Sequence, residues 1–197
     1  MHRMFTNRVL LAVVMAILSL SCACDTDKAT VDEIPDDSRA SEFDRRMISL
    51  TYELARNASH NGNPPFGAIL VRGDSVVAEA TNTGMSTGDV TRHAETGLIS
   101  DASRRFGRDY LSGCWLYTST EPCVMCSGAI RWAGIPRIVY GTPQNIGGKF
   151  HEIPCREILE RIAPRTEVIG PVLQKEGREI RTGFRRGGWK EQKVWSK

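Results

Sequence analysis

The sequence has 197 residues, of which 41% are hydrophobic and 25% are charged, and its net charge is +3. Such a composition is that of an ordinary globular protein with room for one domain of about 150 residues plus additional segments. It excludes a chain too polar to bury a core, and the charge is too small to indicate a nucleic-acid partner by itself.

Residues 1–24 have the layout of a secretory signal peptide. Two arginines precede an apolar run from Val9 to Leu20, which is too short to span a membrane. A small residue at Ala23 predicts cleavage after that position. Cys22 and Cys24 leave a bacterial lipoprotein signal open as an alternative. We therefore expect an exported protein, periplasmic, extracellular or anchored to the membrane through a lipidated cysteine.

Residues 25–40 follow as an acidic segment. Between Asp25 and Asp37 the sequence has six carboxylates and one lysine. Nothing in this stretch can build a core, so it predicts a disordered tether before the domain.

The predicted domain comprises residues 41–173 and opens with a helix. Ser41 is a suitable N-cap, Asp44 is placed to complete a capping box, and apolar residues then recur at helical spacing. The breaker cluster at 61–65 ends this helix. The strands that follow, Phe66 to Val71 and Ser75 to Ala80, form an antiparallel hairpin.

Helices and strands alternate after the polar loop from Asn82 to Thr91. We expect helices from His93 to about Arg105, Pro122 to Trp132 and Cys155 to Ile162, and strands at Trp115 to Thr118, Arg137 to Tyr140 and Glu167 to Val172. Strands separated by helices pair in parallel. The predicted fold class is α/β, a three-layer α/β/α sandwich with a five-stranded mixed sheet.

Two short motifs carry the chemistry. His93 opens the sequence His-Ala-Glu, and Cys123 and Cys126 belong to Pro-Cys-Val-Met-Cys. One imidazole and two thiolates suit Zn²⁺ and leave its fourth position for water, as in a catalytic zinc site. Glu95 lies two residues beyond His93, where it can reach such a water without being a ligand.

Other interpretations of the cysteine pair are a redox motif, a disulfide and half of a structural zinc site. The redox interpretation does not account for the nearby histidine and glutamate. A structural site would require a further cysteine, and Cys114 would have to leave its predicted strand. Both half-motifs favour catalytic zinc.

The chain resembles the zinc-dependent cytidine/deoxycytidylate-type deaminase superfamily, in particular the branch that contains guanine, nucleoside and tRNA adenosine deaminases. The resemblance covers about Phe43 to Val172. Its motifs are Pro65-Phe66-Gly67-Ala68, Asp89-x-Thr91-x-His93-Ala94-Glu95, Glu121-Pro122-Cys123-Val124-Met125-Cys126 and Val139-Tyr140-Gly141. Two departures are Arg92 and the loop 142–151, which match this branch poorly.

The resemblance implies a role for each matching residue. His93, Cys123 and Cys126 would hold Zn²⁺, and Glu95 would shuttle protons. Asn82 would hydrogen-bond the base, the Ala94 amide would contact it near the reacting carbon, and Phe66 would line the pocket.

We therefore expect a hydrolytic deaminase that releases ammonia from a small nucleobase or nucleoside, with a guanine-like purine favoured. A tRNA-specific adenosine deaminase is one alternative, which the predicted export disfavours. A non-catalytic zinc-binding domain is another, which Glu95 disfavours.

Residues 174–197 form a basic tail with Phe184, Trp189 and Trp195 among its cationic residues. Basic charge with aromatic residues is typical of nucleic-acid binding. The alternative, which we favour over nucleic-acid binding, is a solvated basic end whose aromatic residues pack on the domain or on a neighbouring subunit. The sequence leaves open whether the protein forms a homodimer and whether Cys114 and Cys155 form a disulfide.

Overall fold

The computed structural model describes residues 35–144 and 153–187. One mixed sheet organises this part of the chain, with strand order β2-β1-β3-β4-β5. β1 pairs antiparallel with β2 and β3, whereas β3, β4 and β5 run parallel. The strands are β1 (Gly67–Arg72), β2 (Ser75–Thr81), β3 (Trp115–Thr120), β4 (Arg137–Thr142) and β5 (Glu167–Ile169).

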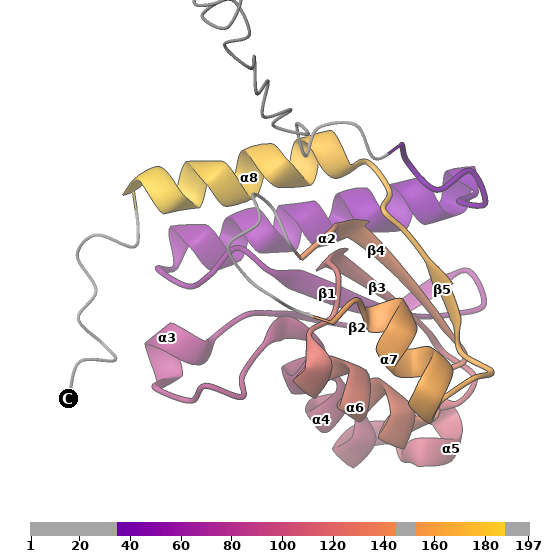
Figure 1. The fold of residues 1–197 in the computed structure, drawn as a ribbon. Helices are drawn as coiled ribbons and strands as arrows, with labels where there is room; N and C mark the ends of the chain where they lie inside the picture. Colours follow the sequence, from indigo (N-terminus) through magenta and orange to yellow (C-terminus); the bar gives the residue numbers. More distant parts are fainter. Residues whose placement is uncertain (1–34, 145–152, 188–197) are drawn as a thin grey trace, which may run out of the picture. The chain divides into compact units, whose positions relative to one another are not determined.

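Helices cover both faces of this sheet, as Figure 1 shows. α2 (Glu42–His60) and α8 (Gln174–Gly187) lie on one face. The opposite face carries α4 (Ala94–Phe106), α5 (Arg108–Leu111), α6 (Val124–Ala133) and α7 (Cys155–Ile162), while α3 (Gly84–Thr87) lies in the connection from β2 to α4. The predicted three-layer sandwich with a five-stranded mixed sheet is confirmed.

Alternating side chains of the strands build a separate core on each face. In β1, Ala68 and Leu70 pack with the residues of α4 and α6, whereas Ile69 and Val71 pack with those of α2. All four are buried, because a strand covered on both sides must be apolar along its whole length.

The first helix follows its capping signal. Asp44 N–H donates to Ser41 Oγ over 3.1 Å, and Ser41 N–H donates back to Asp44 Oδ2 over 2.8 Å. These two bonds satisfy backbone donors that the first turn of a helix leaves without partners. The predicted capping box at the start of α2 is confirmed.

Several predicted boundaries differ from the structure. β5 ends at Ile169 and not at Val172, because Pro171 has no N–H to continue the ladder. The short helices α3 and α5 were not predicted. The helix predicted from Pro122 begins at Val124, with Cys123 as its N-cap. Cys114 and Cys155 are buried free thiols and not a disulfide pair.

The prediction of a disordered tether over residues 25–40 is wrong for Asp36 and Asp37. Asp36 accepts hydrogen bonds from the N–H groups of Leu173 and Gln174, over 2.9 and 3.4 Å, and Asp37 accepts one from Gly170. These carboxylates are part of the domain because they satisfy backbone donors ahead of α8, which a count of charges does not reveal.

The predicted domain boundary at residue 173 is wrong, because residues 174–187 form α8. The expected packing of this segment on its own domain is confirmed over these residues, since α8 packs on α2. Arg56 and Glu176 form an ion pair between these helices, over 2.6 Å. At Gly177 a Cβ atom would collide with Tyr52 and with Thr142 Oγ1, so the close approach of α8 to β4 requires glycine.

Among the described residues, no helix is long and apolar enough to cross a membrane. The predicted signal segment, residues 1–24, and most of the predicted tether lie outside the described residues, as do Trp189 and Trp195.

Candidate active site

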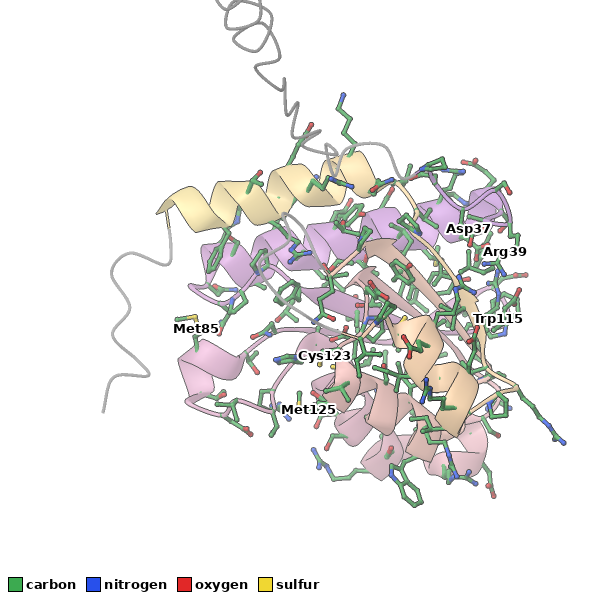
Figure 2. The ribbon with its side chains drawn as sticks, in the orientation of Figure 1. Asp37, Arg39, Met85, Trp115, Cys123 and Met125 are labelled. Carbon is green, nitrogen blue, oxygen red and sulfur yellow. The ribbon has the colours of Figure 1, made fainter. Side chains whose placement is uncertain are left out.

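Two helix N-termini bring the predicted zinc ligands together. His93 is the N-cap of α4, Cys123 is the N-cap of α6, and Cys126 lies in the first turn of α6. Figure 2 shows Cys123 toward the end of the sheet where Met85 of α3 lies, whereas Trp115, the first residue of β3, is at the opposite end. The ligand cluster therefore lies where β3 delivers the chain to α6.

The distances within this cluster fit zinc. The Cys123 and Cys126 Sγ atoms are 3.5 Å apart, and His93 Nδ1 lies 3.6 Å from the first and 3.7 Å from the second. Tetrahedral zinc with ordinary Zn–S and Zn–N bonds separates two sulfurs by about 3.8 Å and a sulfur and a nitrogen by about 3.6 Å. The three donors thus match the spacing that a zinc ion requires, and the soft donor set matches its chemistry.

The two thiols differ in their protonation. The hydrogen bond between the two thiols lowers the pKa of Cys123 to about 4, and His93 acts in the same direction. The same contact, together with burial, raises the pKa of Cys126. Both sulfurs would bind a zinc ion as thiolates, so metal binding at this site would release protons.

Glu95 lies behind these ligands in the first turn of α4 and is buried. Its Oε1 accepts a hydrogen bond from Thr118 Oγ1 over 3.0 Å, and its Oε2 lies 3.5 Å from Cys126 Sγ. Burial is the largest cause that raises the pKa of this carboxyl group. A buried carboxyl group with a raised pKa, next to a metal site, is suited to hold and release a proton.

A backbone hydrogen bond closes the loop between Asn82 and His93. The Thr83 N–H donates to the Arg92 carbonyl, so the residue after Asn82 is hydrogen-bonded to the residue before His93. Asn82 is 2% exposed, and its Oδ1 accepts from Gly84 N–H over 3.0 Å. Because Oδ1 is used in this way, the Nδ2 donor is the atom that Asn82 presents to another molecule.

The backbone at the start of α4 presents another donor. Ala94 is fully buried, and within the described residues its N–H donates to no other group. An open N–H at a helix N-terminus is suited to an electronegative atom of a ligand.

Phe66 lies directly before β1. Its carbonyl accepts a hydrogen bond from the Asn82 N–H over 2.9 Å. The guanidinium of Arg181 in α8 lies 5.8 Å from the centre of the Phe66 ring. Arg181 also donates to the carbonyls of Pro143 and Gln144, over 2.8 and 3.0 Å. α8 therefore contacts, through Arg181, both Phe66 and the residues that follow β4.

Glu121, directly before the Pro-Cys motif, joins two other segments. Its Oε2 accepts from Gln144 N–H over 3.2 Å, and its Oε1 accepts from Cys155 N–H over 2.9 Å. One carboxylate thus links the end of β4 to the start of α7, next to the zinc ligand Cys123.

Residues 41–142 match the family model for the cytidine and deoxycytidylate deaminase zinc-binding region. The chain belongs to this deaminase family. The match contains both half-motifs of the metal centre, and we conclude that the protein is a zinc-dependent hydrolytic deaminase whose cofactor is Zn²⁺.

Relatives within the family act on different substrates. A probable cytosine deaminase of Schizosaccharomyces pombe is 38% identical over 161 residues, 75% of this chain and 96% of that protein. A guanine deaminase of Bacillus subtilis is 41% identical over 98 residues, 50% of this chain and 61% of that protein. A solved tRNA:A34 deaminase matches with a TM-score of 0.59 and 31% identity, over 68% of this chain and 98% of that one.

Sequence reasoning missed three residues of this site: Thr118, Glu121 and Arg181. For Thr118 a signal was present, since Thr-Ser-Thr interrupts an otherwise apolar buried strand. The sequence identifies Glu121 only as the first residue of the Glu-Pro-Cys motif and Arg181 only as one cation of the basic tail, so it does not indicate the contacts of either residue.

Proposed function

We propose that this deaminase acts on a free nucleobase or its nucleoside, with guanine or a close purine relative as the first candidate. The observation that carries the proposal is the Asn82 side chain, which is buried, lies next to a residue hydrogen-bonded to the one before His93, and is oriented by Gly84 so that Nδ2 can donate to a ring carbonyl or ring nitrogen. Phe66, half-buried beside it, offers an aromatic surface for a flat ring.

The reaction adds water to a ring carbon that bears an amine. A zinc ion held by His93, Cys123 and Cys126 would supply the Lewis acidity that lowers the pKa of the attacking water. Glu95 accepts a proton from the attacking water and delivers it to the ring nitrogen next to the reacting carbon. A second proton passes to the amine, the carbon–nitrogen bond breaks, and the products are ammonia and a ring carbonyl.

Small substrates are favoured over transfer RNA because no segment of the sequence near the site is rich in lysine or arginine. Binding a folded RNA requires contacts to many phosphates. Two arginines of α8 are engaged within the protein: Arg178 donates to Gln174 over 2.7 Å, and Arg181 donates to the backbone of Pro143 and Gln144.

Cytosine is the second candidate substrate. The observation in its favour is that the match to the probable cytosine deaminase extends over 96% of that protein, so it includes the region beyond the zinc motifs. Cytosine also offers a ring carbonyl to Asn82 Nδ2 and an amine on a carbon next to a ring nitrogen.

The test is ammonia release by the purified, zinc-loaded protein from guanine, cytosine, adenine, their nucleosides and aminated pterins. We expect turnover of a free base or nucleoside, with guanine fastest. Glu95→Gln is the control, since it should keep zinc and lose turnover by about 10²–10⁴-fold. Inosine formation in a tRNA anticodon arm, with no turnover of the small substrates, would contradict the proposal.

We further propose that the protein is exported. The support is the pattern of residues 1–24, two arginines followed by a short apolar run and small residues. Export would bring the enzyme to free bases and nucleosides and separate it from transfer RNA.

A further inference from the structure

Thr118 occupies the centre of the sheet, directly behind the metal ligands. In β3 it pairs with Ala68 of β1 on one side and with Tyr140 of β4 on the other. Its side chain is completely buried. A hydroxyl in such a position must find a partner within the protein, because no water replaces a lost hydrogen bond there.

The Thr118 hydroxyl contacts two oxygens. Oγ1 lies 3.0 Å from Glu95 Oε1 and 3.1 Å from the Thr120 carbonyl. Both are acceptors when Glu95 is ionised, so they share the single proton of the hydroxyl, and β3 cannot move without breaking its ladders with two neighbouring strands. The hydroxyl is therefore a rigid anchor for the Glu95 carboxylate.

The two Glu95 oxygens have different surroundings. Oε1 is held by the strand, whereas Oε2 lies against Cys126 Sγ at 3.5 Å, on the side of the metal ligands. Apart from that sulfur, Thr118 and the N–H of Glu95 itself are the donors to this carboxylate among the described residues.

We propose that Thr118 is a positioning residue, whose hydroxyl holds Glu95 Oε1 so that Oε2 faces the metal-bound substrate site. A glutamate side chain has three rotatable bonds, so its carboxylate has several orientations when no partner holds it. The hydrogen bond from β3 keeps the carboxylate in the single orientation that proton transfer requires. This inference rests on the deaminase reaction at this site but not on the identity of the substrate.

The test compares Thr118→Val, which keeps the shape and β-branching but removes the hydroxyl, with Thr118→Ser, which keeps the hydroxyl. Thr51→Val is the matched control, since Thr51 is equally buried but its hydroxyl donates to Ile48 within α2. All three proteins are assayed for zinc content and for kcat and KM on the substrate that the wild type turns over.

We expect Thr118→Val to bind one zinc per chain with an unchanged KM and a kcat lower by about 10- to 100-fold, the value of a hydrogen bond to a charged group. Thr118→Ser should recover most of kcat, and Thr51→Val should keep it. A kcat within twofold of wild type in Thr118→Val would overturn the proposal, and so would an equal loss of kcat in Thr51→Val.

Crystal structures of the zinc-loaded proteins provide a readout that does not depend on activity. Wild type and Thr118→Ser should show one orientation of the Glu95 side chain. Thr118→Val should show a rotated side chain or two alternate conformers. If the wild type turns over none of the substrates, the proposed function fails, and this comparison still decides the role of Thr118: an unchanged Glu95 in Thr118→Val refutes it.

Discussion

The guanidinium of Arg137 donates a hydrogen bond to each carboxylate oxygen of Asp44, over 2.8 and 3.0 Å, although the two residues are 93 positions apart in the chain. This bidentate pair joins the start of β4 to the first turn of α2. The Tyr117 hydroxyl donates to the same carboxylate over 2.8 Å. Asp44 is fully buried, so its charge depends on these partners.

The first prediction is that Asp44→Asn lowers the free energy of unfolding by about 3 kcal/mol, because it leaves the Arg137 charge without its buried partner. Chemical denaturation measures this change. Glu157→Gln is the matched control, since it removes an exposed partner of Arg161 and should cost about 0.5 kcal/mol or less. Equal losses in both variants would contradict the importance of the buried pair.

The second prediction concerns pH. Hydrogen bonds from Arg137 and Ser41 hold the pKa of Asp44 well below its usual range, against the opposing effect of burial. A lowered folded-state pKa contributes stability that is fully present above the unfolded-state pKa, about 4, and is lost as pH falls toward the folded-state value. Stability of the wild type should therefore fall below about pH 4, and that part of the fall should be absent in Asp44→Asn.

The third prediction is that Cys123→Ala loses zinc and stability together, because binding energy at such a site is also folding energy. With free zinc at a thousandfold excess over its dissociation constant, the bound metal contributes about 4 kcal/mol. Metal analysis and thermal unfolding measure both effects. Cys114→Ala is the control: it removes a buried thiol directly before β3, at the opposite end of that strand from the cluster, and should keep one zinc per chain. Zinc retained in Cys123→Ala would refute the ligand assignment.

The fourth prediction is that Asn82→Asp raises KM by about 10- to 100-fold. Aspartate keeps the oxygen that accepts from Gly84 N–H but removes the Nδ2 donor. Asn63→Asp is the matched control, since Asn63 is also buried and its Oδ1 accepts from Ser86 N–H. An unchanged KM in Asn82→Asp would remove Asn82 from the substrate site.

The fifth prediction is that the mature protein lacks about its first 23 residues. Cell fractionation and N-terminal mass analysis measure this directly, and a lipidated N-terminal cysteine would appear as a defined mass increase. An intact Met1 in the cytoplasmic fraction would contradict export and would strengthen the tRNA alternative.

The zinc ligands could be predicted from sequence because each half of the site is local. His93 and Glu95 share one helix start, and Cys123 and Cys126 share another, so their relative positions within each pair follow from helix geometry alone. The strand and helix order that brings the two halves together also follows from simple alternation. The prediction of Asn82 and Phe66 as substrate contacts rested on resemblance and stays a prediction.

The contacts that support the site could not be predicted in the same way. Arg181 reaches the backbone of Pro143 and Gln144, nearly forty residues earlier, and nothing in its local sequence distinguishes it from the other cationic residues near it. The prediction for the acidic segment fails for a related reason. The composition around Asp36 and Asp37 predicts solvent exposure, but their partners include backbone groups more than 130 positions away.

The pairing of Asp36 with the backbone before α8 has a practical consequence for defining the domain. A recombinant fragment limited to residues 41–142 would contain every zinc ligand and Glu95, but it would lack this pairing together with α7, β5 and α8. β4 would then become an exposed apolar edge, with Val139 uncovered, which is a site for aggregation. The segment that carries the chemistry is thus shorter than the segment that folds, and expression should begin before Asp36 and continue through α8.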